Sequence, residues 1–300
     1  MGTMKIEPTE FRGWREAYRL RLGEAEMVIV TEIGPRILSL AAGGGPNLLF
    51  VDEETAGQGQ GDAAWYVYGG HRFWIAPETE HTYAPDNARC EVEVATDRLA
   101  VLAPVASQTK LQKRLTVTAR EGRFVVEHGV RYTGDMLYTG APWALTCVEP
   151  KGIVVFPWGR GGAWDLKKII YWSRWIGHGS DVTSQQWQPG PDLFRVAPTG
   201  EEGKVGTSCP EGWVALCRED ATFLKSYHWM PGVRYPDEDC PLQVYTSSRL
   251  IELETLGPLA TFYPDEEVVH REVWTVTAKP TDPADGVALR RLLSCPLRGA

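Results

Sequence analysis

Residues 251–258 read Ile-Glu-Leu-Glu-Thr-Leu-Gly-Pro, a run in which two carboxylates alternate with apolar side chains. Successive side chains of a β-strand point to opposite faces, so Glu252 and Glu254 would share one face and Ile251 and Leu253 the other. A buried carboxylate without a partner is too costly to stay ionised. The acidic face therefore either meets bulk water, as the outer face of an antiparallel sheet does, or lines a solvated cleft that holds a ligand.

Short alternating runs of this kind, separated by Gly, Pro, Asn and Asp, recur along the whole chain of 300 residues. This pattern predicts an all-β sandwich or barrel. Glu121-Gly122 separates two such runs and predicts a tight hairpin, and a helical pattern occurs only at 285–293. There is no repeat of fixed period, linker or shift in composition, so we expect residues 1–300 to form a single domain. The clearest predicted strands are 17–22, 26–31, 36–41, 108–119, 123–132, 144–149, 212–218, 221–227, 250–256 and 270–278.

The composition excludes several classes of protein. A hydrophobic content of 43% with 23% charged residues is typical of a chain that folds around a substantial core. A net charge of −8 and a pI near 5.4 argue against nucleic acid as a partner, because nucleic-acid binders present basic patches. No apolar run approaches the ~20 residues that span a bilayer, and residues 1–11 lack the apolar segment of a signal peptide. We therefore expect a cytoplasmic protein without a membrane partner, and its six cysteines as reduced thiols.

A second cluster, residues 65–81, reads Trp-Tyr-Val-Tyr-Gly-Gly-His-Arg-Phe-Trp-Ile-Ala-Pro-Glu-Thr-Glu-His. Its paired glycines let the backbone approach a ligand closely, beside the polar groups of His71, Arg72 and Glu78 and the flat ring of Trp74. We interpret the cluster as part of a binding site in which Arg72 hydrogen-bonds hydroxyls or a carboxylate of the ligand. The alternative is that the aromatic side chains belong to the core and that Arg72 forms a salt bridge at a rim.

These stretches resemble the galactose mutarotase-like proteins, and the resemblance covers most of the chain. The motifs that carry it are Glu32-Ile33-Gly34-Pro35-Arg36-Ile37, Asn47-Leu48-Leu49-Phe50, Gly70-His71-Arg72-x-Trp74-x-x-Pro77-Glu78, Ala141-Pro142-Trp143-Ala144-Leu145-Thr146, the run 251–258 and His270-Arg271-Glu272-x-Trp274. The resemblance implies a very large antiparallel β-sandwich whose concave face binds a carbohydrate. Aldose 1-epimerases are the best understood enzymes of this group.

The resemblance also implies roles for individual residues. Leu253-Glu254-Thr255 is similar to the strand that carries the catalytic glutamate of the epimerases, so Glu254 would be the general base and His71 the general acid. The base would remove the proton of the anomeric hydroxyl while the imidazolium protonates the ring oxygen, which opens the sugar ring. The remaining expected contacts to the sugar are Arg72, Trp74, Glu78, Trp143, Lys225 and Glu252. Lys225 shares a strand face with Tyr227, which we prefer to the opposite face of His228, and Trp143 is either a stacking platform or core.

Other functions remain open at this point. His71, Glu78, His81, Glu252 and Glu254 are residue types that bind metals, but no HExxH motif or clustered aspartate loop accompanies them, and we expect no metal or cofactor. A carbohydrate-binding protein without turnover is the alternative to an isomerase. A third possibility is a protein that acts through a partner chain, with the acidic strand face as solvated surface. The expected partner is a small carbohydrate, and no pattern indicates a particular sugar or oligomeric state.

Overall fold

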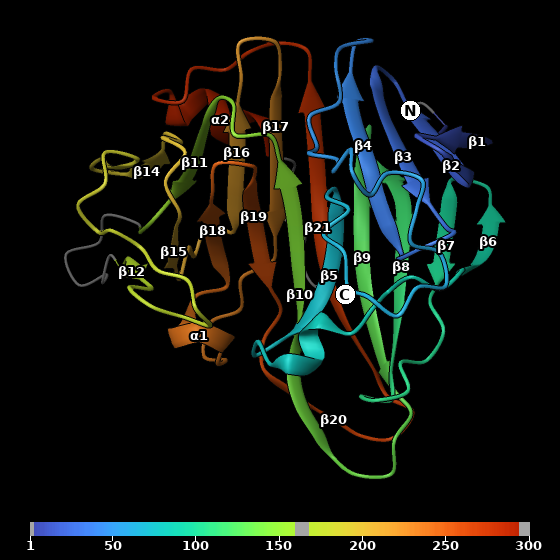
Figure 1. Cartoon of the computed structure of the whole chain (residues 1–300). Helices are drawn as coiled ribbons and strands as arrows, with labels where there is room; N and C mark the ends of the chain where they lie inside the picture. Colours follow the sequence, from blue (N-terminus) through green and yellow to red (C-terminus); the bar gives the residue numbers. More distant parts are fainter. Residues whose placement is uncertain (1–2, 160–167, 294–300) are drawn as a thin grey trace.

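Two large antiparallel sheets face one another in the computed structural model, which describes residues 3–159 and 168–293 (Figure 1). The predicted all-β sandwich is confirmed. In spatial order the first sheet contains β1 (Lys5–Phe11), β2 (Trp14–Leu22), β3 (Ala25–Val30), β4 (Arg36–Ala42), β5 (His71–Ala76), β10 (Tyr138–Val148), β19 (Ile251–Leu256), β18 (Leu242–Thr246), β15 (Gly203–Thr207) and β12 (Ile170–Tyr171), and β20 (Ala260–Phe262) pairs with β10.

The second sheet has ten strands. In spatial order they are β13 (Trp187–Pro189), β14 (Leu193–Val196), β11 (Ile153–Pro157), β16 (Trp213–Cys217), β17 (Thr222–Tyr227), β21 (Glu267–Thr277), β9 (Arg123–Tyr132), β8 (Leu111–Arg120), β7 (Arg98–Leu102) and β6 (Glu91–Ala95). Helical structure in the described residues is limited to the 3-10 helix η1 (Glu80–Tyr83) and the short helices α1 (Pro236–Asp239) and α2 (Gly286–Leu292). None of these helices has the length and apolar character needed to cross a membrane.

The main hydrophobic core fills the space between the sheets. It combines Phe73 and Leu253 of the first sheet with Phe124 and Trp274 of the second. Leu253 is fully buried there, and the carboxylates that flank it point to the outer face of the first sheet, as the alternation of residues 251–258 predicts. Glu254 is also fully buried, so at this position the outer face is covered by other side chains and is not plain solvated surface.

Local sequence signals explain the ends of several elements. Glu121 and Gly122 both have positive φ, 52° and 75°, and Arg120 pairs with Arg123, so the predicted two-residue hairpin is confirmed. The predicted C-terminal helix is α2, whose first amide groups are capped by the Asp285 carboxylate.

The prediction missed β5, because all six of its residues are buried and its sequence lacks the alternation of a half-exposed strand.

The register of three central strands positions the candidate site. β10 pairs with β5 on one side and with β19 on the other, and Leu145 lies opposite both Arg72 and Glu254. These three side chains therefore share the outer face of the first sheet. At the next pair of the two antiparallel strands, His71 lies opposite Thr146, and both side chains point to the inner face, toward the second sheet.

Candidate functional site

A pocket of about 350 Å³ lies on the outer face of the first sheet, over β5, β10, β15, β18 and β19. Of the eight residues that the sequence predicts for the site, six line this pocket: Arg72, Trp74, Glu78, Trp143, Glu252 and Glu254. Three indole rings form an aromatic wall, with ring centroids 6.1 Å apart for Trp65 and Trp74 and 5.5 Å apart for Trp74 and Trp143. The pocket therefore combines flat apolar surface with several charged groups, which is the usual character of a small-molecule site.

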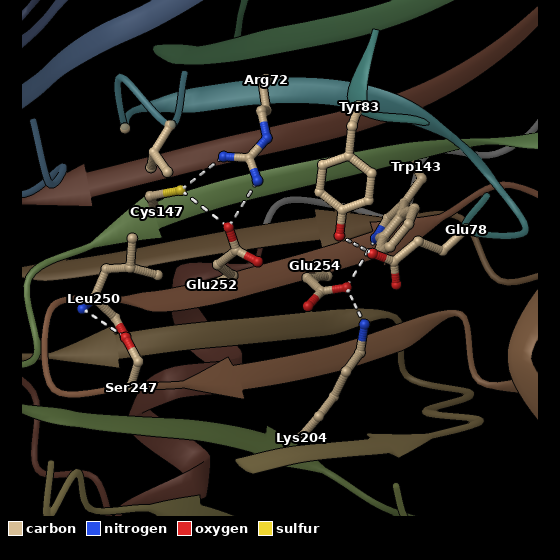
Figure 2. Close-up of polar contacts among 12 residues, drawn as sticks. Arg72, Glu78, Tyr83, Trp143, Cys147, Lys204, Ser247, Leu250, Glu252 and Glu254 are labelled. Carbon is tan, nitrogen blue, oxygen red and sulfur yellow. Dashed lines mark hydrogen bonds and ion pairs between the residues drawn. The ribbon is translucent and has the colours of Figure 1, made fainter. Parts of the chain in front are cut away.

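Glu254 is the most deeply buried acid of the pocket. Its Oε2 accepts hydrogen bonds from Trp143 Nε1 at 2.8 Å and from Lys204 Nζ at 3.0 Å (Figure 2). Its Oε1 has no hydrogen-bond partner among the described residues. Burial and, to a smaller extent, the Glu252 carboxylate raise the pKa of Glu254 to about 7, against the opposing effect of the Lys204 ammonium. A carboxyl group with a pKa near neutral pH and one unpaired oxygen is suited to accept a proton.

Glu252 and Arg72 form the second ion pair of the pocket. Arg72 Nη2 lies 3.0 Å from Glu252 Oε1, and the same oxygen accepts from Cys147 Sγ at 3.3 Å (Figure 2). The guanidinium carbon also stacks 4.3 Å from the centre of the Trp74 ring. Burial opposes the charge of Arg72, but Glu252, Cys147 and Asp86 together outweigh it and raise the pKa of Arg72. The planar guanidinium is therefore held in one orientation, with its Nε atom unpaired in the described part of the chain.

Lys204 and His178 are among the pocket residues that the sequence analysis did not predict. Lys204 lies on β15, where its ammonium group is 4.8 Å from the centre of the Trp143 ring, and its alternation with core Val205 is the one available signal. His178 lies in the loop before β13, where no periodicity exists to place it. Its Nδ1 is 2.8 Å from Glu202 Oε1, and Tyr245 Oη donates to the same oxygen at 2.9 Å. Burial raises the pKa of Glu202, but these two hydrogen bonds outweigh it, so the carboxylate is favoured.

The expected convergence of His71 and Glu254 on one cleft is wrong. His71 precedes Arg72 in β5, so its side chain points to the opposite face of the strand, into the layer between the sheets, where it is fully buried. Its Nε2 lies 2.7 Å from His128 Nε2 and its Nδ1 lies 2.9 Å from Thr146 Oγ1. Burial, which disfavours the charged form, is the main cause that holds the pKa of His71 well below its ordinary value, and the nearby His128 lowers it further. This neutral imidazole lies outside the pocket and is not an acid for a ligand there.

The expectation that Lys225 contacts a ligand in the cleft is also wrong. Lys225 does share a strand face with Tyr227, but this face of β17 points into the core. Its Nζ forms an ion pair with Glu272 Oε1 at 2.8 Å and donates to Thr146 Oγ1 at 3.1 Å. Burial acts to raise the pKa of Glu272, but the Lys225 ammonium and the three neighbouring histidines together outweigh it and hold that pKa far below its usual range.

His71 and Lys225 belong to one polar network between the sheets, and its hydrogen bonds assign the state of each imidazole. His128 Nδ1 lies 3.0 Å from the carbonyl oxygen of His270, which only accepts, so His128 Nδ1 carries the proton. His128 Nε2 is then the acceptor for the Nε2–H of His71. The remaining nitrogen of His71, Nδ1, accepts from the Thr146 hydroxyl. All of these bonds are made with neutral rings, in agreement with the lowered pKa values of His71 and His128.

The other branch of the network ends on Glu272. Thr255 Oγ1 donates to Glu272 Oε1 at 2.5 Å and accepts from His270 Nε2 at 2.7 Å, and Trp274 Nε1 donates to Glu272 Oε2 at 2.8 Å. His71, His128 and Glu272 have ligand atoms within 4.8 Å of one another, a spacing compatible with a metal ion. Each of those atoms already has a hydrogen-bond partner, and Lys225 supplies the positive charge that Glu272 requires. This chemistry fits a structural network that links the two sheets.

Comparisons with known proteins bear on the fold. No family model matches the chain, and no curated protein matches it. Its structure is similar to a candidate aldose 1-epimerase from Klebsiella pneumoniae, with TM-score 0.61, 9% identity and coverage of 97% of this chain and 87% of that one. A galactose mutarotase-like protein from Clostridium acetobutylicum gives TM-score 0.56, 10% identity and coverage of 92% and 99%. The chain has the galactose mutarotase-like fold.

A third protein with this fold, a galactose mutarotase related enzyme from Lactobacillus acidophilus, matches with TM-score 0.56 and 10% identity over 88% of this chain and 99% of that one. The matches extend over nearly the full length of each chain, so both sheets of the galactose mutarotase-like sandwich are present. At such low identity the similarity shows the fold alone. The chemistry of the site has to be inferred from the residues that line it.

The inner network generates a prediction about stability. Lys225→Met leaves the Glu272 carboxylate buried without its counter-ion, so we expect the free energy of unfolding to fall by about 3–5 kcal/mol in denaturant titrations. Adding Glu272→Gln removes the uncompensated charge and should recover most of that loss. The matched control Lys151→Met, at an exposed lysine, should change the free energy of unfolding by less than about 0.5 kcal/mol. A double variant no more stable than Lys225→Met alone would contradict this assignment.

The outer pocket generates a prediction about protonation. Lys204→Met removes the ammonium that lowers the pKa of Glu254, so that pKa should rise from about 7 by about 1 unit or more. Carbon-13 titration of the glutamate carboxyls measures it, with the Glu254 signal assigned from Glu254→Gln. Because the folded-state pKa lies above the ordinary 4.5, the stabilising contribution of Glu254 is present at low pH and is lost as the pH rises through about 7. An unchanged titration in Lys204→Met would show that Lys204 does not control this carboxyl group.

Proposed function

We propose that the pocket on the outer face binds a small free sugar and that the protein interconverts its anomers, as an aldose 1-epimerase does. The observation that carries the proposal is Glu254, a fully buried carboxyl group with a pKa near 7 and one unpaired oxygen. The likeness of the fold to a candidate aldose 1-epimerase and to galactose mutarotase-like proteins supports it.

The polar atoms of the pocket complement a polyol. Trp65 Nε1 and Arg72 Nε are donors, and Glu254 Oε1 is an acceptor, and none of the three has a hydrogen-bond partner among the residues described. Buried polar atoms are rarely left unpaired in a folded protein, so each is a candidate partner for a ligand hydroxyl. The indoles of Trp74 and Trp143 supply apolar area against which the C–H face of a pyranose stacks. The volume of about 350 Å³ suits one monosaccharide.

The charges of the pocket favour an uncharged sugar over a phosphorylated one. Arg72 is paired with Glu252 at 3.0 Å, and Lys204 is paired with Glu254 at 3.0 Å. The third cation, Arg249, lies 3.1 Å from the Asp52 carboxylate. Each lysine and arginine that lines the pocket in the described part of the chain is therefore already paired, and the carboxyl group of Glu78 adds a further acidic function. An anionic ligand would need to displace one of these pairs.

The proposed reaction transfers two protons across one sugar ring. Glu254 Oε1 removes the proton of the anomeric hydroxyl, the carbonyl bond forms at C1, and the bond between C1 and the ring oxygen breaks as that oxygen is protonated. Rotation about the C1–C2 bond and reversal of the steps produce the other anomer. Lys204 favours the ionised form of Glu254 between turnovers.

We assign the acid to His178 in place of His71. His178 lines the pocket, and the contact of its Nδ1 with the Glu202 carboxylate orients the ring, which leaves Nε2 to protonate the ring oxygen. The alternative, a carbohydrate-binding protein without turnover, is favoured by one observation: the histidine expected on β5 lies between the sheets.

The test is anomer exchange measured by NMR magnetisation transfer on a panel of aldoses, including glucose, galactose, mannose and xylose. Glu254→Gln should lower kcat by about 100-fold or more, while the affinity for the sugar stays within about tenfold, because the base acts on the barrier. In the wild type, kcat/KM should rise with pH through about 7, as Glu254 loses its proton. His178→Asn should lower kcat, and the control His81→Gln, at an exposed histidine outside the pocket, should not.

Two outcomes contradict the proposal in different ways. If a sugar binds but its anomers exchange no faster than in buffer, the protein binds carbohydrate without turnover. If no aldose in the panel binds, both the epimerase and the carbohydrate-binding hypotheses are excluded.

A further inference from the structure

A second pocket, of about 260 Å³, lies beside η1 and between the two sheets. It is lined by core residues of both sheets, Ile75 of the first and Leu111 of the second. Trp74 is the single described residue that also lines the candidate sugar site. The segment that follows β5 separates the two pockets. Its Thr79 and Thr82 line the second pocket, while its Glu78 and Tyr83 line the pocket on the outer face of the first sheet.

Lys113 introduces a charge into this pocket. On β8 it lies two residues from Leu111 and two from Leu115, both of which are core residues, so its side chain shares the inward face of the second sheet. Its ammonium nitrogen is 5.7 Å from the centre of the Phe73 ring. Within residues 3–159 and 168–293 its ammonium group makes no hydrogen bond and no ion pair. Burial lowers the pKa of Lys113, and the Asp86 carboxylate, which is not in ion-pair contact with it, offsets this effect only in part.

The neighbouring charges are already matched. Asp86, the carboxylate of the pocket wall, accepts two hydrogen bonds from Arg36 Nη2, at 2.9 and 3.0 Å. Arg72, on the far side of β5, is paired with Glu252. His81, at the mouth, lies 3.9 Å from Glu80. Among the described residues that line the pocket, Lys113 is therefore the lysine without a carboxylate in contact, and one monoanion would supply that contact.

The rest of the wall is mostly apolar. Pro104, Val105 and Ala106 line it from the loop after β7, and Tyr138 lines it from β10. The volume lies just below the roughly 300–1,000 Å³ typical of drug-sized ligands, so the occupant must be small. An apolar cavity with one unmatched ammonium group is complementary to an apolar molecule that carries one carboxylate.

We propose that this pocket is a second ligand site, which binds a small monocarboxylate with its carboxylate on Lys113 and its apolar body between Tyr138 and the loop 103–109. The site is independent of the sugar pocket and of the reaction proposed there.

Isothermal titration calorimetry with octanoate and 4-phenylbutyrate tests the site, with octan-1-ol as the uncharged comparison. Wild-type protein should bind at least one carboxylate about tenfold more tightly than the alcohol, because a charge-assisted hydrogen bond to Lys113 accompanies the apolar contact. Lys113→Met keeps the length of the side chain and removes the ammonium, so this advantage of the carboxylate should disappear. The matched control Lys110→Met, at an exposed lysine that does not line the pocket, should bind like the wild type.

Ala106→Trp, which places a large ring in the pocket from a loop, should abolish binding of both carboxylates, and it carries the test if Lys113→Met does not fold. The proposal is overturned if neither carboxylate binds the wild type at millimolar concentration, or if octan-1-ol binds as tightly as octanoate. It is also overturned if binding survives unchanged in Lys113→Met or in Ala106→Trp.

Discussion

The alternation of side chains along β5, β10 and β19 is the constraint on which the rest of this structure depends. These three strands pair in one register, so a shift of one residue exchanges the two faces. On the outer face the alternation brings Arg72, Glu252 and Glu254 into one pocket with three indole rings. On the inner face it sends His71 to a network that the pocket does not reach. Adjacent residues of one strand thus line the pocket on one side and join the inner network on the other.

The same strands contribute side chains to the inner network and to the outer pocket. Thr146 of β10 and Thr255 of β19 bond to the inner network, and their neighbours in sequence point outward, toward the pocket. A closed set of hydrogen bonds with a buried ion pair specifies geometry more than it adds stability. This explains why a core that could have been apolar holds Lys225 and Glu272: the network fixes the strands from which Glu254 and the indoles project.

Much of the outer site was predictable, because it follows from local alternation. The run 251–258 placed both glutamates on one face, and the motif at 70–78 supplied Arg72, Trp74 and Glu78. The face of His71 was not predictable, since β5 is buried on both sides and its sequence has no alternation. The prediction that Lys225 and Tyr227 share one face of their strand was correct. Which of the two faces points into the core depends on how the second sheet packs, and the sequence of the strand does not show this. Lys204 and His178 reach the pocket through long-range contacts; alternation with Val205 indicates the face of Lys204 but not its partner, and the loop that holds His178 has no periodicity.

Strand alternation puts His71 in a buried network and leaves His178 at the pocket. Nitrogen-15 NMR of histidine-labelled protein, assigned with single His→Gln variants, distinguishes the two environments. We expect His71 to stay neutral from about pH 5 to pH 8 with its proton on Nε2, and His128 to stay neutral with its proton on Nδ1. A His71 ring that gains a proton within that range, with ring nitrogens that respond to added sugar, would contradict this placement of His71.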